Sequence, residues 1–452
     1  MALFADYMAS VEPQVLQTAQ STSSSSDERP TVQRRFVGRK ARINNTDGSN
    51  QTLATRTPRK SKVPVLNQIP PEILDDADLN SAISSLLPAN YDFEIHKCIW
   101  NIRRHKYSRI ALQMPEGLLI FACVISDILE RFAGHDISCV IMGDVTYGAC
   151  CIDDFTAKAL GCDLLIHYAH SCLVPVDVTE MRVLYVFVSI TINEQHLIAT
   201  LKENFDPGKR LALVGTIQFN GALHAVRNAA LAEPQTLGGL TVQVPQISPL
   251  SRGEILGCTA PRIDPADTDA IVYVGDGRFH LEAAMIQNPG LPAYRYDPYS
   301  RKFTHETYEH DEMLHVRHDA VQAAKSAKKV GVILGTLGRQ GNYATFDHIR
   351  QLLANRGIDY TLLLLSEIFP QKLAEFTHLD AFVQIACPRL SIDWGYAFAK
   401  PLLTPYEASI AFGNTELWSS LEDVLHGQGD GYRMDYYAKD GLGRTRQATV
   451  SR

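Results

Sequence analysis

Three cysteines in short stretches rich in small residues are the side chains with the clearest potential for chemistry. Cys150 lies in a Tyr-Gly-Ala-Cys-Cys stretch, Cys258 in Leu-Gly-Cys-Thr and Cys387 in Ala-Cys-Pro. No Cys-x-x-Cys pair includes any of them, and they are 108 and 129 positions apart. Thiolates bind soft metals and iron–sulfur clusters. If the three thiols meet, the fold must bring one from each third of the chain.

Three thiols without a local fourth partner favour a 4Fe-4S cluster in which one iron stays open to a substrate. Zinc more often uses closely spaced ligand pairs. Adjacent side chains generally diverge, so one residue of the pair Cys150 and Cys151 is expected to face a cluster, and we favour Cys150. Cys172 follows a strand-like run and is a substitute ligand. The cysteines expected to be small buried apolar residues are Cys98, Cys123, Cys139 and Cys162.

The composition is that of an ordinary globular protein. The chain has 452 residues, 45% hydrophobic and 21% charged, which is enough for about three domains. No apolar run approaches the roughly 18 residues that a membrane span needs, so we expect a soluble protein. The first residues do not resemble an export or transit signal, which predicts a cytoplasmic location. In a reducing compartment the nine cysteines are candidates for ligands, catalytic thiols or core residues rather than disulfides.

The charge is unevenly distributed. Residues 29–62 carry ten Lys or Arg against one Asp, although the whole chain has a net charge of −7. The remainder is therefore acidic, which argues against a nucleic-acid site on the folded part. Residues 1–70 are Ser-rich and basic with few apolar side chains, so we expect a disordered arm.

A threefold repeat of strand patterns runs through the rest of the chain. Each copy has a strand-and-turn segment, at 110–117, 211–216 and 330–336. Each also has a segment that begins with Asp, at 163–170, 269–276 and 380–387. Runs that are apolar on both faces predict parallel strands covered by helices. All three cysteines can follow strand ends, where ligands gather in such sheets, although not at equivalent positions.

These patterns predict an α/β fold with three similar small parallel-sheet domains. The expected divisions are the arm 1–70, a linker and short helix 71–90, domains at 91–205 (with Cys150), 206–318 (with Cys258) and 319–414 (with Cys387), and a tail 415–452. We expect the short helix over Glu72–Leu87 and a loosely ordered chain after Asn414.

Two polar loops could complete a site. Gly275–His280 and Gly335–Asn342 each follow a strand and open a helix. Their glycines would let backbone N–H groups approach an anionic group such as a carboxylate. The alternative, a tight turn with an exposed Arg, is equally compatible with the sequence.

Longer motifs resemble a known family, the eukaryotic 2-(3-amino-3-carboxypropyl)histidine synthases of diphthamide biosynthesis, and within it the catalytic first subunit. The motifs are GDVTYGACCIDDF at 143–155, PLSRGEILGC at 249–258, GDGRFHLE at 275–282, YDPY at 296–299 and ACPRLSIDWG at 386–395. The likeness extends from about Tyr91 to Ala411. The N-terminal arm corresponds to no motif of the family.

The resemblance implies a fold, a cofactor and a reaction. It implies three domains in a pseudo-threefold triangle, with Cys150, Cys258 and Cys387 on a central 4Fe-4S cluster. S-adenosylmethionine would bind the open iron, and a radical would transfer the 3-amino-3-carboxypropyl group to a histidine of translation elongation factor 2. This is the first step of diphthamide biosynthesis, and the enzyme is a transferase.

The resemblance also implies partner proteins, and two alternative functions remain. The partners are a homologous second subunit in a heterodimer, the elongation factor as substrate and a small iron-containing electron donor. From their loop positions, Arg278, Arg339 and Arg389 are candidates to bind the S-adenosylmethionine carboxylate. One rival is a quinolinate-synthase-like 4Fe-4S enzyme, and the other is a non-catalytic supporting subunit.

Overall fold

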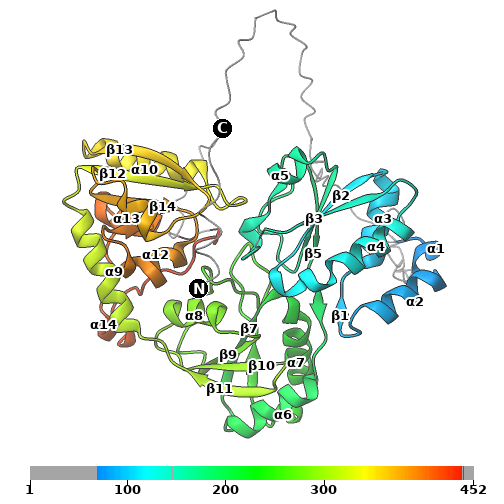
Figure 1. Ribbon diagram of the computed structural model, residues 1–452. Coiled ribbons are helices and arrows are strands. Elements are labelled where there is room, and N and C mark those ends of the chain that lie inside the picture. Colours follow the sequence, from blue (N-terminus) through cyan, green and yellow to red (C-terminus); the bar gives the residue numbers. More distant parts are fainter. Residues whose placement is uncertain (1–68, 145, 440, 442–452) are drawn as a thin grey trace, which may run out of the picture. The chain divides into compact units, whose positions relative to one another are not determined.

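Three sheets with one shared strand order make up most of the structure (Figure 1). The computed structural model describes residues 69–144, 146–439 and 441, which fall within one unit, Leu66–Arg452. The arm predicted to be disordered, residues 1–70, lies outside the described residues except for its last two.

The first sheet has the strand order β3-β2-β4-β5, with every pair parallel. Its strands and the elements around it are α1 (Pro71–Leu74), α2 (Ala77–Leu86), β1 (Tyr91–Asp92), α3 (Ile95–His105), β2 (Arg109–Gln113), the 3-10 helix η2 (Glu116–Phe121), α4 (Ala122–Phe132), β3 (Ser138–Met142), η3 (Ala149–Cys151), α5 (Asp154–Ala159), β4 (Leu164–Tyr168), β5 (Arg182–Val186), β6 (Ser189–Ile190) and α6 (Glu194–Asn204).

The second sheet has the order β11-β10-β9-β7-β8, in which β11 is an antiparallel edge strand. Its elements are β7 (Arg210–Gly215), η4 (Ile217–Phe219), α7 (Asn220–Ala232), η5 (Pro234–Leu237), β8 (Thr241–Gln243), β9 (Ala270–Val274), α8 (Phe279–Gln287), β10 (Ala293–Asp297), β11 (Lys302–Glu306) and α9 (His310–Ala324).

The third sheet has the order β13-β12-β14-β15 and is again parallel throughout. Its elements are β12 (Lys329–Gly335), α10 (Tyr343–Asn355), β13 (Asp359–Leu365), α11 (Pro370–Ala374), β14 (Ala381–Ile385), α12 (Pro388–Trp394), η6 (Gly395–Ala397), β15 (Leu402–Leu403), α13 (Pro405–Phe412) and α14 (Leu421–Leu425).

The strand order confirms the predicted α/β class and its repeat. In each sheet the second strand in sequence pairs with the first, the first with the third, and the third with the fourth. The order therefore reverses between the first and third strands, and in open α/β sheets such a reversal marks the ligand side at the carboxyl ends of the strands. The triangular arrangement and the exact domain limits stay predictions.

An aspartate before the third strand of each sheet explains why the Asp-led segment recurs. The Asp163 carboxylate accepts the backbone N–H of Ser108, that of Asp269 accepts the N–H of Arg210, and that of Asp380 accepts the N–H of Lys329. These distances are 2.7–2.9 Å, and each bond aligns the start of the first strand with the start of the third. Charge-assisted bonds of this kind are roughly twice as strong as neutral ones.

The single helix predicted over Glu72–Leu87 is wrong, because the segment forms two helices. The chain breaks after α1, and the Asp76 carboxylate accepts the backbone N–H groups of Asp78 and Leu79 to begin α2. A side chain that caps a helix satisfies donors that have no partner inside it. Asp is one of the residue types that commonly cap helices, so Asp76 was a signal in the sequence for the start of α2.

The prediction of loose order after Asn414 is also wrong for the described part of that segment. Tyr432, Met434 and Tyr436 are all buried. The Tyr432 hydroxyl donates to Glu407 at 2.7 Å, and Glu407 forms a fully buried ion pair with Arg317. Glycines between 427 and 431 gave this segment a loop-like composition and hid the alternating apolar residues that follow.

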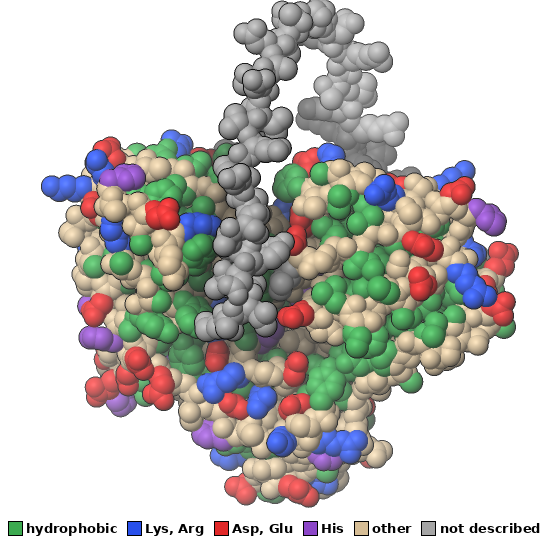
Figure 2. Space-filling view, in the orientation of Figure 1, with side chains coloured by type: hydrophobic (Ala, Val, Ile, Leu, Met, Phe, Trp, Pro, Cys, Tyr) green, Lys and Arg blue, Asp and Glu red, His purple; other side chains and the backbone are tan. Residues whose placement is uncertain are grey.

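The surface is mixed in character. Acidic, basic and apolar side chains are interspersed over the face shown in Figure 2. Among the described residues, no helix combines the length and apolar character required to cross a bilayer.

Candidate thiol site

Cys150 and Cys151 lie in the short helix η3, seven residues after the end of β3. Their backbone is held by two other elements. The Gln113 side chain at the end of β2 donates to the Cys151 carbonyl at 2.9 Å, and the Arg339 backbone N–H donates to the Cys150 carbonyl at 2.8 Å. These bonds fix the direction of both thiols.

Cys258 lies in a turn that the C-terminal segment holds in place. Leu256 and Thr259 exchange backbone hydrogen bonds across the turn. The Tyr436 backbone N–H donates to the Cys258 carbonyl at 3.2 Å. Gly257 is required because a Cβ there would lie 2.0 Å from the ring of Phe279. The segment that the sequence left as a loose tail is therefore part of the support for this thiol.

Cys387 lies two residues after the end of β14 and precedes Pro388, the first residue of α12. The Gln384 side chain donates to the Cys387 carbonyl at 2.8 Å and to the Ser391 hydroxyl at 3.0 Å. The thiol is thus placed at the carboxyl end of the third strand, at the strand reversal of its sheet.

The structure brings these thiols together. A hydrogen bond from Cys150 lowers the pKa of Cys151 to about 7, and the same contact with burial raises that of Cys150 well above its ordinary value. The Cys258 and Cys387 thiolates are close enough to raise the pKa of Cys150 further. Burial also raises the pKa of Cys387. Neighbouring thiols that cannot all ionise alone would be stabilised as thiolates by a metal centre.

The donors at this site are thiols. Among the described residues, no group of three or more His, Cys, Asp or Glu is arranged to hold one metal ion. A cluster holds its thiolates on different irons, so they lie farther apart than ligands of one ion. The thiols of Cys151, Cys258 and Cys387 all raise the pKa of Cys150, and thiolate donors suit iron and sulfide.

A loop of the third sheet is clamped onto the first cysteine stretch. Gly338 has φ +54°, and a Cβ there would lie 2.5–2.7 Å from the backbone of Cys151. The buried Asp154 carboxylate pairs with the Arg339 guanidinium at 2.5 Å. Burial alone would raise the pKa of Asp154, but the bond from Arg339 holds it below its ordinary value. The predicted approach of this loop to an anionic group stays a prediction, and the contact that Gly338 makes is with the Cys151 backbone.

Gln340, in the same loop, contacts the thiols directly. It is buried, and its Nε2 donates to the sulfur of Cys151 at 3.5 Å and of Cys150 at 3.7 Å. Sequence reasoning missed Gln340 and Gln113, because both act on cysteines that are far away in sequence. The available signal was their position in the sequence. Gln113 ends β2, the first strand of its sheet, and Gln340 lies in the loop after β12, the first strand of the third sheet.

The three predicted arginines all have protein carboxylate partners. Arg278 pairs with Glu282 and Glu306, and Arg339 pairs with Asp154. The side chain of Arg389 pairs with Glu282 and Asp393, and it donates to the carbonyls of Gly257 and Phe279. Arg389 therefore links the Cys258 turn to the helix that follows Cys387.

The structure does not bring Cys172 to the other thiols. It is exposed, and the charged groups that influence its pKa are Lys97, Glu254 and Glu94. Cys98 and Cys162 are buried as predicted, and Cys139 is half-buried. Cys123 is exposed on α4, so its predicted burial is wrong.

A cavity of about 620 Å³ opens beside Cys387, and we call it the thiol-side cavity. Its lining includes Gln340, Arg389 and Cys387. The other lining residues are Asp144, Tyr147, Phe279, Leu337, Ser366, Glu367, Ile368, Ala386, Leu390, Asp393 and Trp394. The site therefore has an open path from the surface to a thiol.

Fold and site together define the class: a protein with three α/β sheets whose loops each supply a cysteine to one thiol site. The model of the family described as "Putative diphthamide synthesis protein" matches residues 114–422. This chain is 57% identical to 2-(3-amino-3-carboxypropyl)histidine synthase subunit 1 of Yarrowia lipolytica, over 92% of this chain and 90% of that protein. It is 52% identical to the subunit 1 of Saccharomyces cerevisiae, over 93% and 98%.

A solved structure agrees with these relatives. The crystal structure of Dph2 from Pyrococcus horikoshii with a 4Fe-4S cluster matches with a TM-score of 0.59 and 26% identity, over 73% of this chain and 93% of that one. The chain belongs to the diphthamide synthesis family.

Proposed function

We propose that this chain catalyses the first step of diphthamide biosynthesis. The reaction is the iron–sulfur-dependent radical transfer of the 3-amino-3-carboxypropyl group from S-adenosylmethionine to a histidine of translation elongation factor 2. The observation that carries the proposal is the convergence of cysteines from three sheets, in a chain whose relatives are named histidine synthase subunit 1.

Cys150, Cys258 and Cys387 would hold a 4Fe-4S cluster. When bound, such a cluster supplies a low-potential electron and an open iron for the methionine end of S-adenosylmethionine. A set of three half-buried thiols fits this group, and the related Dph2 structure carries one. Cys151 would serve the site through its backbone, which Gln113 holds.

The chain's own residues would orient and shield the reacting groups. Gln340 donates to the sulfurs, and hydrogen bonds to ligand sulfurs are one determinant of a cluster's reduction potential. The clamp of Gly338 and Arg339 covers the Cys151 side of the site. Excluding water there would protect a reactive radical from side reactions.

Of the three predicted arginines, we retain Arg389 as the contact for the S-adenosylmethionine carboxylate. Among the three, it is the one that lines the thiol-side cavity. Its Nη2 makes one bond, to Glu282, which leaves a second N–H available to a ligand. Arg278 and Arg339 lie outside that lining, and we assign them structural ion pairs.

The proposal includes partners. The relatives are named as a first subunit, which supports an assembly of more than one chain, and we propose a homologous second subunit. A small iron-containing protein would deliver electrons, and a cytoplasmic location would give access to the elongation factor.

The test is a reconstitution. The chain and its second subunit are purified anaerobically, loaded with iron and sulfide, reduced, and given S-adenosylmethionine labelled in the aminocarboxypropyl group with the elongation factor. Label on one histidine of the elongation factor is the expected result. Label-free elongation factor, with quinolinate formed in a parallel assay that supplies small dicarboxylate-type substrates, would instead support the rival enzyme. Activity of the second subunit alone would support a non-catalytic role for this chain.

A further inference from the structure

We propose that the rim of the thiol-side cavity is the docking surface for the protein substrate, and that it receives a cationic, histidine-bearing loop. The inference rests on the proposed function and names residues that would recognise the substrate. Tyr147 and Trp394 would hold the loop, and Asp144 and Glu367 would attract its charge.

Two aromatic side chains at the rim are largely exposed. Tyr147 is 72% exposed and Trp394 is 58% exposed, and both line the cavity that reaches Cys387. Pockets for small molecules bury most of their lining, whereas exposed aromatic anchors are typical of protein interfaces. This exposure favours a macromolecule at the rim over the co-substrate, which would lie deeper, beside Cys387 and Arg389.

The charge of the rim specifies the chemistry of the partner. Asp144 and Glu367 are exposed, and within the described part of the chain neither forms an ion pair. The cation in the lining, Arg389, is already paired with Glu282 and Asp393. A rim with two unpaired carboxylates suits a loop that carries positive charge near the target histidine. Tryptophan and tyrosine faces also attract cations.

The rim residues come from the loops after two strands and from the end of a helix. Asp144 and Tyr147 follow β3, Glu367 follows β13, and Trp394 ends α12. The helix α12 is fixed by the fully buried Arg317, whose Nη1 donates to the Ser391 carbonyl at 2.7 Å. All four side chains lie beyond the carboxyl ends of the strands, where ligands of such sheets gather.

The test measures binding and catalysis separately. In the reconstituted complex, Tyr147→Ala and Trp394→Ala should each weaken binding of the elongation factor by about tenfold or more, as loss of an aromatic anchor does. The visible absorption of the cluster and the KM for S-adenosylmethionine should stay at the wild-type value. Asp144→Asn with Glu367→Gln should weaken binding less, and mostly at low ionic strength. The matched control is Tyr396→Ala, because Tyr396 is 69% exposed, near Trp394 in sequence and outside the cavity lining.

Wild-type binding of the elongation factor in both aromatic variants would overturn the inference. A raised KM for S-adenosylmethionine with unchanged protein binding would also overturn it, since the rim would then belong to the co-substrate. Because binding is measured directly, these results differ from failure of the proposed function, in which wild-type protein would transfer no label.

Discussion

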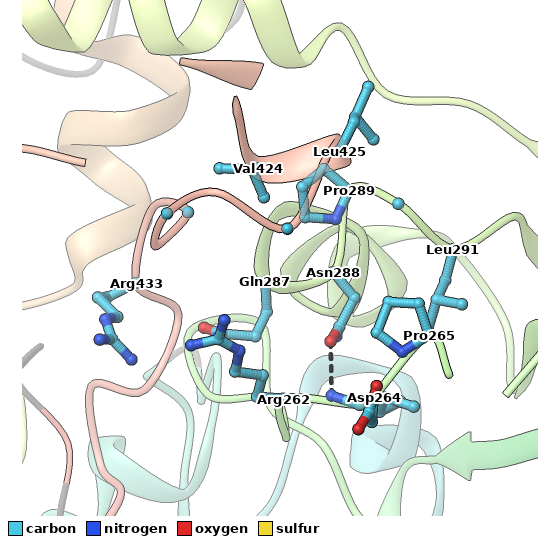
Figure 3. A pocket seen from close by; sticks show the side chains of 15 residues that line it. Arg262, Asp264, Pro265, Gln287, Asn288, Pro289, Leu291, Val424, Leu425 and Arg433 are labelled. Carbon is cyan, nitrogen blue, oxygen red and sulfur yellow. Dashed lines mark hydrogen bonds between the residues drawn. The ribbon is translucent and has the colours of Figure 1, made fainter. Parts of the chain in front are cut away.

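Two cavities of similar volume show what distinguishes a candidate active site from a structural gap. The thiol-side cavity has about 620 Å³, and a second one of about 590 Å³ lies between the end of α8 and the C-terminal segment (Figure 3). We call the second the C-terminal cavity. It has two arginines, two polar amides and glycines, and by composition it could bind an anion.

The polar groups of the C-terminal cavity are occupied by one another. Arg262 and Arg433 both pair with Asp430. The Asn288 side chain accepts the backbone N–H of Ile263 at 2.7 Å, which is the dashed line in Figure 3, and Gln287 accepts that of Met434. In the thiol-side cavity, by contrast, the carboxylates of Asp144 and Glu367 form no ion pair within the described residues. Unsatisfied chemistry, rather than volume, marks the functional site.

The largest expected effect comes from the first cysteine pair. Cys150→Ala should remove product, because Cys150 is the residue of this pair that we propose as a cluster ligand, and its thiol lies near those of Cys258 and Cys387. Cys151→Ala should keep the cluster and part of the activity, since its backbone bonds remain. Product formed per protein is the measurement. The reverse pattern, with activity lost in the Cys151 variant and kept in the Cys150 variant, would exchange their roles.

The next effect is on stability and comes from the clamp. Arg339→Ala leaves the buried Asp154 carboxylate unpaired, which should lower the free energy of unfolding by roughly 3 kcal/mol at pH 7. In the wild type the folded-state pKa of Asp154 is below its ordinary value. Ionised Asp154 therefore stabilises the fold at pH values above its ordinary pKa, and this stabilisation is lost as the pH falls through the lowered folded-state pKa.

In the variant, burial dominates and Asp154 protonates more easily, so the deficit should shrink as the pH falls from 7 toward 4. Urea unfolding at several pH values measures this. A deficit that is constant with pH would show that the ion pair is not its cause. The double variant Arg339→Met with Asp154→Leu serves as the control and should recover much of the loss.

A smaller effect is expected at Gln340. Gln340→Leu keeps the size of the side chain and removes the N–H that reaches both sulfurs. Activity should fall about tenfold, and the reduction potential of the reconstituted cluster should become more negative, because an electron-withdrawing hydrogen bond is lost. Redox titration gives the potential. An unchanged reduction potential in a folded Gln340→Leu variant that holds the cluster would show that Gln340 does not influence the cluster.

The smallest effect is expected in the C-terminal cavity. Arg262→Ala removes a surface ion pair whose side chains are 60% and 56% exposed, so stability should change by less than about 1 kcal/mol. Activity should equal that of the wild type. A marked loss of transfer activity in this variant would contradict the assignment of the C-terminal cavity as a structural gap.

Much of the fold could be predicted from local patterns. The apolar runs identified the central strands β2, β7 and β12 because buried parallel strands are apolar on both faces. The family motifs identified the three stretches that contain Cys150, Cys258 and Cys387. Both signals are contained in a few consecutive residues.

The support of the site could not be predicted in this way. Gln340 reaches cysteines about 190 positions away, and the C-terminal segment holds the Cys258 turn across a comparable distance. Such pairings depend on tertiary packing, which local periodicity does not encode. The arginines were predicted to bind a ligand from their loop positions. The pairs of Arg339 with Asp154 and of Arg389 with Glu282 could be found only in three dimensions.

The central claim is that one cysteine from each third of the chain holds the same cluster. The most direct measurement is bound iron, with visible absorption, after anaerobic reconstitution of Cys150→Ala, Cys258→Ala and Cys387→Ala, with Cys123→Ala as the exposed control. The account predicts that each of the first three loses the cluster and that the control keeps it. A full complement of iron in any of the first three variants would contradict the claim.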